Sequence, residues 1–418
     1  MKKVVLGVFV LGIALIVALP AALARSDRPT ATPGVTSRSI TIGGSFPFSG
    51  PVSSYAPLAK GMEAYFKYVN ARKGPDGKRG VYGRQIIFKQ YDDGYNPANT
   101  VQMTNKLVLE DKVFAIVGTL GTEANLAIRP MLNQRKIPQA NILTGASYWG
   151  SQYKQYPWTI GWLLDYVSEG NMLAKWVLAN AARQKIGILY QNDDYGKDYL
   201  RGFKAGLGAA GRSKLVSERS YEVSDASYAP QIIQQRGAGV DTWVLFTTAG
   251  TPTVRALATA AQLRWKPDQI ILNSVAATDG VMQSVAARTG QAYLNGIVST
   301  TYVKNVTNPK YKNDSAIKTY RRIMANYGPD GINIRNKFYY TGVANASDFV
   351  KMLYKAGKNL TRESLRKAYA KQNWVNPYLL KGSRVKTGAR DHFPIDQAKI
   401  TVYNNGSFSD QGRLLKGR

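Results

Sequence analysis

The sequence predicts an α/β protein of two lobes, each a parallel sheet flanked by helices, joined by a hinge of several strands. Three observations support this prediction. Apolar, β-branched runs alternate with longer amphipathic runs along the whole chain. An aromatic-rich interruption at residues 148–166, broken by glycine and proline, divides the alternation into two series. Mostly helical sequence at 315–371 then follows the second series without strands of its own.

The chain begins with a pattern that is typical of secretory signal peptides. In MKKVVLGVFVLGIALIVALPAALA, two lysines precede an apolar run, and the small-residue pattern Ala22-Leu23-Ala24 follows it. We therefore expect a signal peptide at 1–24 and, in the proline- and threonine-rich RSDRPTATPGVTS, a flexible leader at 25–37. An uncleaved membrane anchor fits less well, because the apolar run is short for a span. The expected location is the periplasm or the outer face of the cytoplasmic membrane.

Composition excludes several kinds of chemistry. The chain has no cysteine, so disulfides, thiolate nucleophiles and a cysteine-anchored lipoprotein are excluded. Its single histidine, His392, rules out any site with several histidine ligands. No serine-elbow or paired-acid motif surrounds His392, and we interpret it as a turn or surface residue. We expect no catalytic residue, no metal and no cofactor.

The formal net charge of +30 raises the question of nucleic-acid binding. Nucleic-acid binders concentrate lysine and arginine in a patch or stripe with interleaved aromatic residues. Here the basic residues are spread over the length of the chain in short clusters. We therefore interpret the charge as a basic surface that favours anionic ligands or an anionic envelope, and we expect no nucleic-acid partner.

The first series begins after the leader and predicts one parallel sheet. Its strands are expected at 39–44, 85–91, 113–117 and 137–143, and its helices near 56–70, 97–110 and 123–134.

The second series predicts a sheet of the same kind. Its strands are expected at 185–190, 215–221, 242–248, 269–273 and 296–302, its helices at 167–182, 195–210, 228–235 and 252–263, and a last strand at 398–403. Because the late helices have no sheet of their own, we expect them to pack on the first lobe, so that the chain crosses the hinge more than once. The predicted lobes are 38–160 with 303–375, and 161–302 with 376–418.

A hydroxyl-rich loop, FPFSGPVSSY, follows the first strand at the position where α/β proteins commonly bind small ligands. Further motifs follow it in order: YGRQIIFKQYDDGYNP, VFAIVGTLGTEAN, KIPQANILTGAS, ILYQNDDYGKD, GKNLTRESLRKA and DHFPIDQAKI. With these motifs the sequence resembles the periplasmic solute-binding proteins of the branched-chain amino acid ABC transporter class, the leucine-binding-protein family. That resemblance implies the type I fold of two Rossmann-like lobes. It also implies a non-enzymatic, monomeric receptor that delivers a small-molecule ligand to a membrane permease and its ATPase.

The resemblance also implies a ligand site between the lobes. Tyr55 and Tyr195 match tyrosines of the first and second lobe, and Thr122 matches a residue whose hydroxyl and N–H hold the ligand carboxylate. Gly145 and Ser147 match the next loop, which adds a carbonyl and a hydroxyl. Small residues and hydroxyls can bind a carboxylate without arginine, since N–H and O–H groups supply the donors.

One departure from the family pattern bears on the ligand. Amino-acid binders of this family place an acidic side chain in the second lobe to pair with the ligand ammonium, but here LNSVAATDG has Asn273, Ser274 and Val275 where the acid would be expected. Thr248 stands where the family has a ligand-facing tyrosine. An unpaired buried ammonium is costly, so we expect a carboxylate without an amine, or an amide, as ligand. An amino acid stays possible if Asp279 folds back to the cleft.

Two other functions stay open. The same fold could serve as a sensory ligand-binding module for a separate signalling partner. An exported α/β hydrolase is the other alternative, although the sequence has no G-x-S-x-G, GxxxxGK[ST] or G-x-G-x-x-G motif after a strand. The pairs Asp92–Asp93 and Asp193–Asp194 could suggest metal or acid/base chemistry, but at strand-to-helix turns we interpret them as helix caps.

Overall fold

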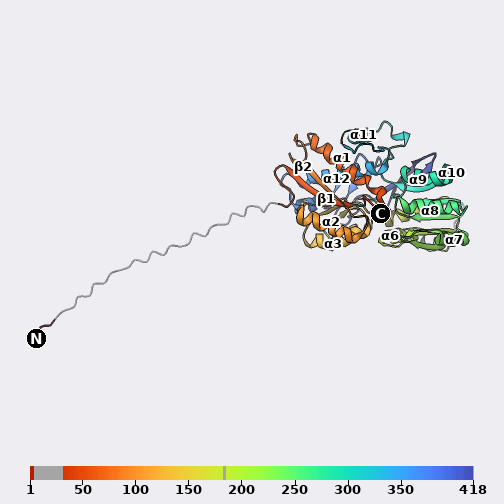
Figure 1. Ribbon diagram of the computed structural model, residues 1–418, viewed down its shortest axis with the longest axis horizontal. Coiled ribbons are helices and arrows are strands. Elements are labelled where there is room, and N and C mark those ends of the chain that lie inside the picture. Colours follow the sequence, from red (N-terminus) through yellow and green to blue (C-terminus); the bar gives the residue numbers. More distant parts are fainter. Residues whose placement is uncertain (4–31, 182–184, 418) are drawn as a thin grey trace. The chain divides into compact units, whose positions relative to one another are not determined.

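The computed structural model describes residues 1–3, 32–181 and 185–417. The predicted signal peptide, apart from its first three residues, and most of the predicted leader lie outside the described residues. From Thr32 onward the chain forms one compact unit with two large sheets and a small two-stranded one. The predicted α/β class, with parallel strands flanked by helices, is confirmed (Figure 1). Within the described ranges no helix is long and apolar enough to cross a membrane.

The first lobe is built on a five-stranded parallel sheet in the order β2-β1-β3-β4-β5. Helices cover both faces of this sheet in Figure 1, with α1 and α12 on one side of β1 and α2 and α3 on the other. Strand β1 is buried along most of its length, as expected for a strand covered on both faces. The elements are β1 (Ser39–Phe46), η1 (Ser53–Tyr55), α1 (Pro57–Ala71), β2 (Gln85–Asp92), α2 (Pro97–Asn105), η2 (Lys106–Glu110), β3 (Ile116–Val117), α3 (Thr122–Gln134), β4 (Gln139–Ile142), α4 (Tyr148–Ser151) and β5 (Thr159–Gly161).

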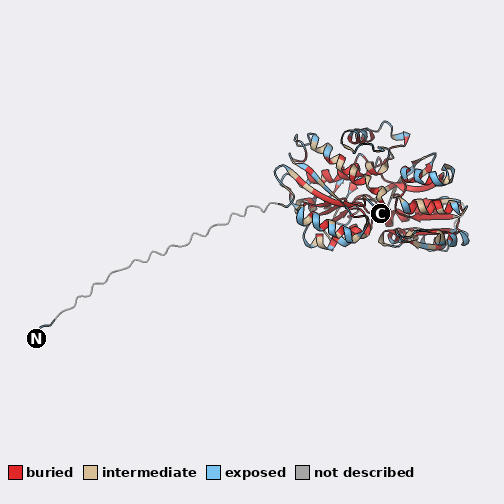
Figure 2. Cartoon of the chain, in the orientation of Figure 1, coloured by how far each residue is buried: buried red, intermediate tan, exposed pale blue. Residues whose placement is uncertain are grey.

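The second lobe is built on a seven-stranded sheet in the order β14-β13-β10-β9-β8-β6-β7. Neighbouring strands among β6 to β10 pair in parallel, whereas β13 runs antiparallel to both β10 and β14. Figure 2 shows that its buried residues concentrate in the strands and on the inner sides of the helices. The elements are α5 (Tyr166–Asn180), β6 (Ile186–Gln191), α6 (Asp194–Arg212), β7 (Leu215–Tyr221), α7 (Ala229–Gly237), β8 (Thr242–Phe246), α8 (Thr251–Gln262), β9 (Gln269–Leu272), α9 (Asp279–Thr289), α10 (Gln291–Leu294), β10 (Ile297–Thr301), β13 (Gln397–Asn404) and β14 (Ser407–Lys416).

After β10 the chain returns to the first lobe. Helix α12 packs lengthwise on α1, and two glycines allow the close approach. A Cβ atom at Gly61 would lie 2.2 Å from the carbonyl oxygen of Tyr339, and one at Gly342 would lie 2.1 Å from that of Leu58. This packing brings the start of α12 toward the loop that precedes α1. The returning elements are η3 (Pro309–Tyr311), α11 (Ser315–Tyr327), α12 (Lys337–Ala356), α13 (Arg362–Ala370), β11 (Asn373–Trp374) and β12 (Val385–Lys386).

A buried carboxylate fixes the returning segment. Asp348 of α12 accepts hydrogen bonds from the indole nitrogens of Trp162 (2.8 Å) and Trp374 (2.7 Å) and from the amide of Asn376 (2.7 Å). Burial raises the pKa of Asp348, while these donors act in the opposite direction. The carboxylate thus joins the aromatic stretch, α12 and β11. The lobe boundaries of the sequence analysis stay predictions.

Candidate functional site

A cleft opens where loops of both lobes meet. It is lined by Tyr55, Leu58, Tyr95, Leu120, Gly121, Thr122, Leu143, Thr144, Leu163, Tyr166, Tyr195, Thr248, Ser274, Val275, Tyr302, Val303, Lys337, Phe338 and Thr341. Most of these side chains are aromatic or aliphatic, and a few hydroxyls and one ammonium supply the polar groups. This is the usual composition of a small-molecule site, with apolar walls and a small number of polar groups that fix orientation.

The start of α3 forms one end of the cleft. Its N-cap is Gly121, at φ +99°, and no side chain caps the helix. A side chain there would be strained at this φ, and its Cβ would lie 2.9 Å from the ring of Tyr95. Thr122, the first helical residue, shares a 2.6 Å hydrogen bond with the hydroxyl of Thr144. A helix start without a side-chain cap, with two hydroxyls beside it, is suited to a carboxylate.

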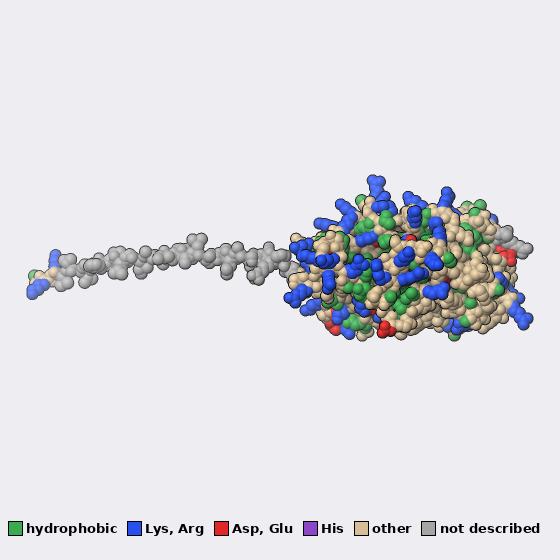
Figure 3. Space-filling view, turned by 90° about the horizontal axis from the view of Figure 1, so that it is seen from above, with side chains coloured by type: hydrophobic (Ala, Val, Ile, Leu, Met, Phe, Trp, Pro, Cys, Tyr) green, Lys and Arg blue, Asp and Glu red, His purple; other side chains and the backbone are tan. Residues whose placement is uncertain are grey.

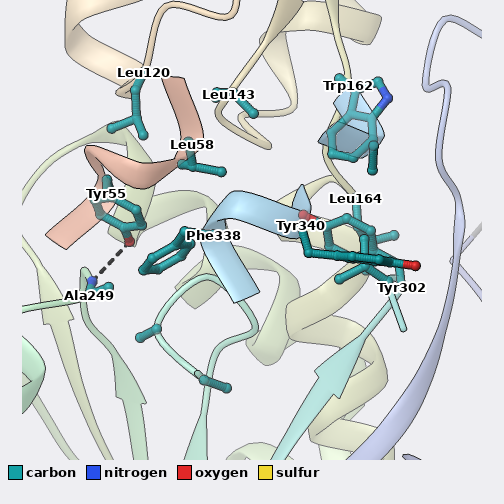
Figure 4. Packing of buried hydrophobic residues seen from close by; sticks show 14 of the residues in the cluster. Tyr55, Leu58, Leu120, Leu143, Trp162, Leu164, Ala249, Tyr302, Phe338 and Tyr340 are labelled. Carbon is teal, nitrogen blue, oxygen red and sulfur yellow. Dashed lines mark hydrogen bonds between the residues drawn. The ribbon is translucent and has the colours of Figure 1, made fainter. Parts of the chain in front are cut away.

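Tyr55 joins the two lobes across the cleft. Its hydroxyl accepts a hydrogen bond from the N–H of Ala249 (2.9 Å) and donates to the carbonyl oxygen of Val275 (3.3 Å). Burial raises the pKa of Tyr55, so the hydroxyl stays protonated and can donate. The ring of Tyr55 packs 5.0 Å from that of Phe338, and Figure 4 shows both rings on one side of Leu58.

Two predicted residues of the second lobe line the cleft and a third lies behind it. Tyr195 donates to the carbonyl oxygen of Thr247 (2.8 Å), and Thr248 donates to the side chain of Gln191 (3.1 Å). Asn273 is fully buried and donates to the hydroxyl of Tyr195 at 2.5 Å. Asn273 is not among the lining residues, so its contact with the cleft runs through Tyr195.

The remaining predicted residues, Gly145 and Ser147, do not line the cleft. The carbonyl oxygen of Gly145 accepts from the N–H of Tyr166 (2.8 Å). The N–H and hydroxyl of Ser147 donate to the carboxylate of Asp198, at 2.7 and 3.3 Å. Their polar groups are thus used within the protein, and Thr144 of the same loop lines the cleft instead.

Lys337 is a lining residue that the sequence analysis missed. It is the first residue of α12, where the helix dipole disfavours a cation. Its ammonium donates to the carbonyl oxygen of Ala277 (3.2 Å), which leaves two of its three donors for other partners. Burial lowers the pKa of Lys337 to about 8, and the charges of Asp279 and Glu169 act in the opposite direction. A lysine before an aromatic run has no sequence signature that would have identified it.

Among the described residues that line the cleft there is no aspartate or glutamate. The Asp279 carboxylate, the alternative partner for an ammonium, accepts from Ser407 (3.1 Å), from the N–H of Phe408 (3.0 Å) and from Thr307. Asp279 does not line the cleft but a small neighbouring hollow, which Lys337 also lines.

Glu169, a second buried carboxylate, lies behind the cleft wall. It accepts from the N–H and hydroxyl of Ser274 (2.6 and 2.7 Å) and from Tyr199 (2.8 Å). It therefore holds the loop of Ser274 in place from the side opposite to the cleft. The cleft itself presents cationic and hydroxyl donors without a carboxylate.

The structure also shows where the histidine and the paired aspartates of the sequence lie. His392 is buried rather than exposed, and its ring stacks on that of Tyr153 at 3.3 Å, outside the cleft lining. In the described part of the chain, no group of three or more His, Cys, Asp or Glu residues could hold a metal ion. Asp193 caps α6, as predicted, by accepting from the N–H of Gly196 (3.0 Å). The predicted capping by Asp92 and Asp93 is wrong, because Asn96 caps α2 and the two aspartates accept from N–H groups of loops.

Comparison with known proteins agrees with this architecture. A Leu/Ile/Val-binding protein homologue from Brucella melitensis is 24% identical over 204 residues, which cover 48% of this chain and 52% of that protein. The chain thus spans about half the length of the curated relatives it matches.

Solved structures share the fold. One is a branched-chain amino acid ABC transporter protein from Thermus thermophilus with bound valine, with a TM-score of 0.76 at 19% identity over 91% of this chain and 97% of that one. Another is a solute-binding protein from R. palustris in complex with 4-hydroxybenzoate, with a TM-score of 0.73 at 17% identity, covering 90% and 97%. The profile of the periplasmic binding protein family matches residues 39–407. The chain therefore belongs to the periplasmic binding protein family, a family of binding proteins and not of enzymes.

Proposed function

We propose that this protein is the extracytoplasmic solute receptor of an ABC importer, and that its solute is a small carboxylate with an apolar body and no ammonium group. The solute is captured between the lobes, which close around it by bending at the hinge, a motion that this architecture commonly uses. A cleaved signal peptide at 1–24 exports the protein, which acts as a monomer and passes the solute to a permease and its ATPase.

The charge of the cleft lining is the observation that carries this proposal. A zwitterionic amino acid needs a donor set for its carboxylate and an acceptor, usually an acid, for its ammonium. The start of α3, with Thr122 and Thr144, supplies donors for a carboxylate, and Lys337 adds a positive charge. Among the described residues that line the cleft, no acid is present to pair with an ammonium. A carboxylate alone matches these groups, whereas an ammonium would lie near a like charge.

The walls of the cleft support an apolar or aromatic body for the solute. Rings of Tyr55, Tyr95, Tyr166 and Phe338 lie beside leucine and valine side chains. Aromatic faces favour offset or edge contacts with another ring. Known relatives are named for leucine, isoleucine and valine, and structures of the same fold hold valine or 4-hydroxybenzoate.

A thermal-shift screen tests the proposal. The chain from Arg25 onward is heated with aromatic and aliphatic carboxylates, with leucine, isoleucine and valine, and with amides, since a ligand that binds the folded state raises the Tm. We expect carboxylates to raise the Tm and branched-chain amino acids to leave it unchanged. The opposite ranking would refute the proposed solute class. Uptake of the identified solute by cells with and without this protein then distinguishes an importer receptor from a sensory module.

A further inference from the structure

Basic residues occur along the whole chain, but the net positive charge per residue is higher at 315–386 than in the chain as a whole. Residues 315–386 contain fifteen lysines and arginines but only three acids, whereas the whole chain has 56 and 26. Of these acids, Asp348 is buried and Glu363 pairs with Arg366 at 2.6 Å, which leaves Asp330. Figure 3, a view onto the side of the molecule where α11 lies, shows many lysine and arginine side chains scattered over the visible face, mainly on its left and centre, and few acids.

Hydrogen bonds of two lysines hold segments of the returning chain together. Lys304 pairs with Asp314, the cap of α11, at 2.7 Å and donates to the carbonyl oxygen of Pro377 at 2.7 Å. Lys355 of α12 donates to the carbonyl oxygen of Lys371. We call the surface of these segments the basic face, and its exposed charged residues are Lys318, Arg321, Arg322, Lys355, Lys371, Lys381, Arg384 and Lys386.

An apolar side chain projects from the basic face. Val375 is 56% exposed, more than any other large hydrophobic side chain of the described residues apart from Met1. Beside it, Trp374 is half-buried, and the ammonium of Lys355 lies 5.6 Å from its ring centre. Lys351 holds the loop against α12 by donating to the carbonyl oxygen of Val375 at 2.5 Å. The segment therefore presents tryptophan and valine between lysines, a combination that suits the boundary between lipid and water.

We propose that the basic face docks the protein on the surface of an anionic lipid bilayer, with Val375 and the exposed edge of Trp374 entering the headgroup region. Each lysine or arginine held near an anionic bilayer contributes about 1 kcal/mol, and the attraction acts over roughly a Debye length. A soluble polyanion such as a nucleic acid would bind the lysines and arginines, but contact with the exposed Val375 would not stabilise its binding. This difference favours a bilayer.

Vesicle co-sedimentation tests the proposal. The chain from Arg25 onward is used, because residues 1–24 would themselves enter vesicles, and every described helix and strand lies from Ser39 onward. We expect sedimentation with phosphatidylcholine vesicles that contain phosphatidylglycerol, little with phosphatidylcholine alone, and release at high salt. Absence of binding to the anionic vesicles at low salt would overturn the proposal.

Two variants with equal loss of charge locate the contact. The first replaces Lys318, Arg322, Lys381 and Lys386 by glutamine, and we expect binding about 100-fold weaker or more, from the loss of four charges near the bilayer. The control replaces Lys175, Lys197, Arg212 and Arg264, exposed residues of the second lobe, by glutamine, and should stay within about threefold of the wild type, because charges beyond a Debye length are screened. An equal loss in both variants would show a general charge effect and refute the docking face.

A single substitution separates a bilayer from a polyanion. Val375→Ser removes an exposed apolar group without changing charge, and we expect vesicle binding to fall about fivefold, while polyphosphate binding stays unchanged. If Val375→Ser binds vesicles as the wild type does, and polyphosphate binds as tightly as vesicles, the face is a polyanion site and the proposal fails. An unchanged Tm in each variant verifies that the fold is intact.

Discussion

Two helices of this protein, one in each lobe, begin in the same way but have different neighbours. Helix α3 starts at Gly121-Thr122 after β3, and α8 starts at Gly250-Thr251 after β8. Both N-cap glycines have a positive φ, +99° and +90°, and neither helix has a side-chain cap. Each helix start therefore presents N–H groups and the positive end of the helix dipole at the carboxyl edge of a sheet.

The two helix starts differ in the partners of their N–H groups. The N–H of Thr251 donates to the carbonyl oxygen of Pro51 (3.2 Å), and the preceding Ala249 donates to Tyr55 (2.9 Å), so the first lobe itself occupies the start of α8. The start of α3 lines the cleft instead. The start of α8 thus contacts the first lobe, whereas the start of α3 lines the cleft, although both begin with a glycine and a threonine. They differ in the first turn, where α3 has Glu123 and α8 has Pro252.

The largest expected effect comes from placing a negative charge at each helix start. Thr122→Asp puts a carboxylate where we propose that the solute carboxylate binds, and like charges in contact cost several kcal/mol. We expect solute affinity to fall at least about 100-fold by calorimetry. Thr251→Asp, at the matching position of α8, lies at an exposed site and should change affinity by less than about twofold. Equal losses in both variants would contradict the distinction between the two helix starts.

Removing the hydroxyl that occupies the start of α8 should have a smaller effect. Tyr55→Phe keeps the ring but leaves the buried N–H of Ala249 without its partner, which costs about 1–3 kcal/mol. Since this contact exists only when the lobes are together, we expect affinity to fall about tenfold. Small-angle scattering should show a larger radius of gyration for the solute-free variant than for the wild type. Unchanged affinity and radius would show that Tyr55 does not stabilise closure.

These helix starts also show how much of the site could be predicted from sequence. Tyr55, Thr122, Tyr195 and Thr248 follow predicted strands or begin predicted helices, and the fold brings all four to the cleft. Residues that directly follow parallel strands lie close together, because the carboxyl ends of these strands meet at the same edge of the sheet. Lys337 could not be found this way, since its position depends on how α12 packs on α1, which local sequence does not specify.

Each predicted strand overlaps a strand of the structure, whether it is buried, as β8 is, or half-exposed, as β7 is. The strand at Leu215–Tyr221 has the predicted bounds, and other strands differ by a few residues. Strand β5 was missed because it has only three residues within the aromatic interruption. Strand β14, SFSDQGRLLK, was missed because it is a largely exposed edge strand whose polar sequence resembles a turn. Helix α9 was missed as well, because its sequence DGVMQSVAART has little amphipathic pattern.

Solute affinity should depend on pH through Lys337, which lines the cleft. Its pKa in the solute-free protein is about 8, so the charged form that pairs with an anion is lost as the pH rises above 8. We expect the Kd to increase up to tenfold per pH unit above that value in the wild type. Lys337→Met should bind more weakly at pH 7 and show no such dependence. A wild-type Kd that stays constant from pH 7 to 9.5 would exclude a charged Lys337 from solute binding.

Lys337 should also make the free energy of unfolding depend on pH. Because the pKa of Lys337 is lower in the folded state than the ordinary value of 10.5, the unfolded chain binds more protons between pH 8 and 10.5. The contribution of Lys337 to the free energy of unfolding therefore rises with pH in that window and is lost as the pH falls through 8. Relative to Lys337→Met, the wild type should gain stability between pH 8 and 10 in denaturant titrations. A constant difference would contradict the lowered pKa.

The smallest effect on the solute is expected from Glu169, which supports the cleft from behind. Burial raises its pKa above the ordinary 4.5, against the hydrogen bonds that Ser274 and Tyr199 donate. The folded protein therefore holds the proton of Glu169 more firmly than the unfolded chain does. The contribution of this proton to stability is full below pH 4.5 and is lost as the pH rises through the raised pKa.

The variant Glu169→Gln has no titrating group at this position. Relative to this variant, the wild type should lose stability as the pH rises from 4 to 7 in thermal unfolding, while solute affinity changes less than in Tyr55→Phe. A larger loss of affinity than in Tyr55→Phe would mean that the Ser274 loop, and not the junction at α8, limits capture by the second lobe.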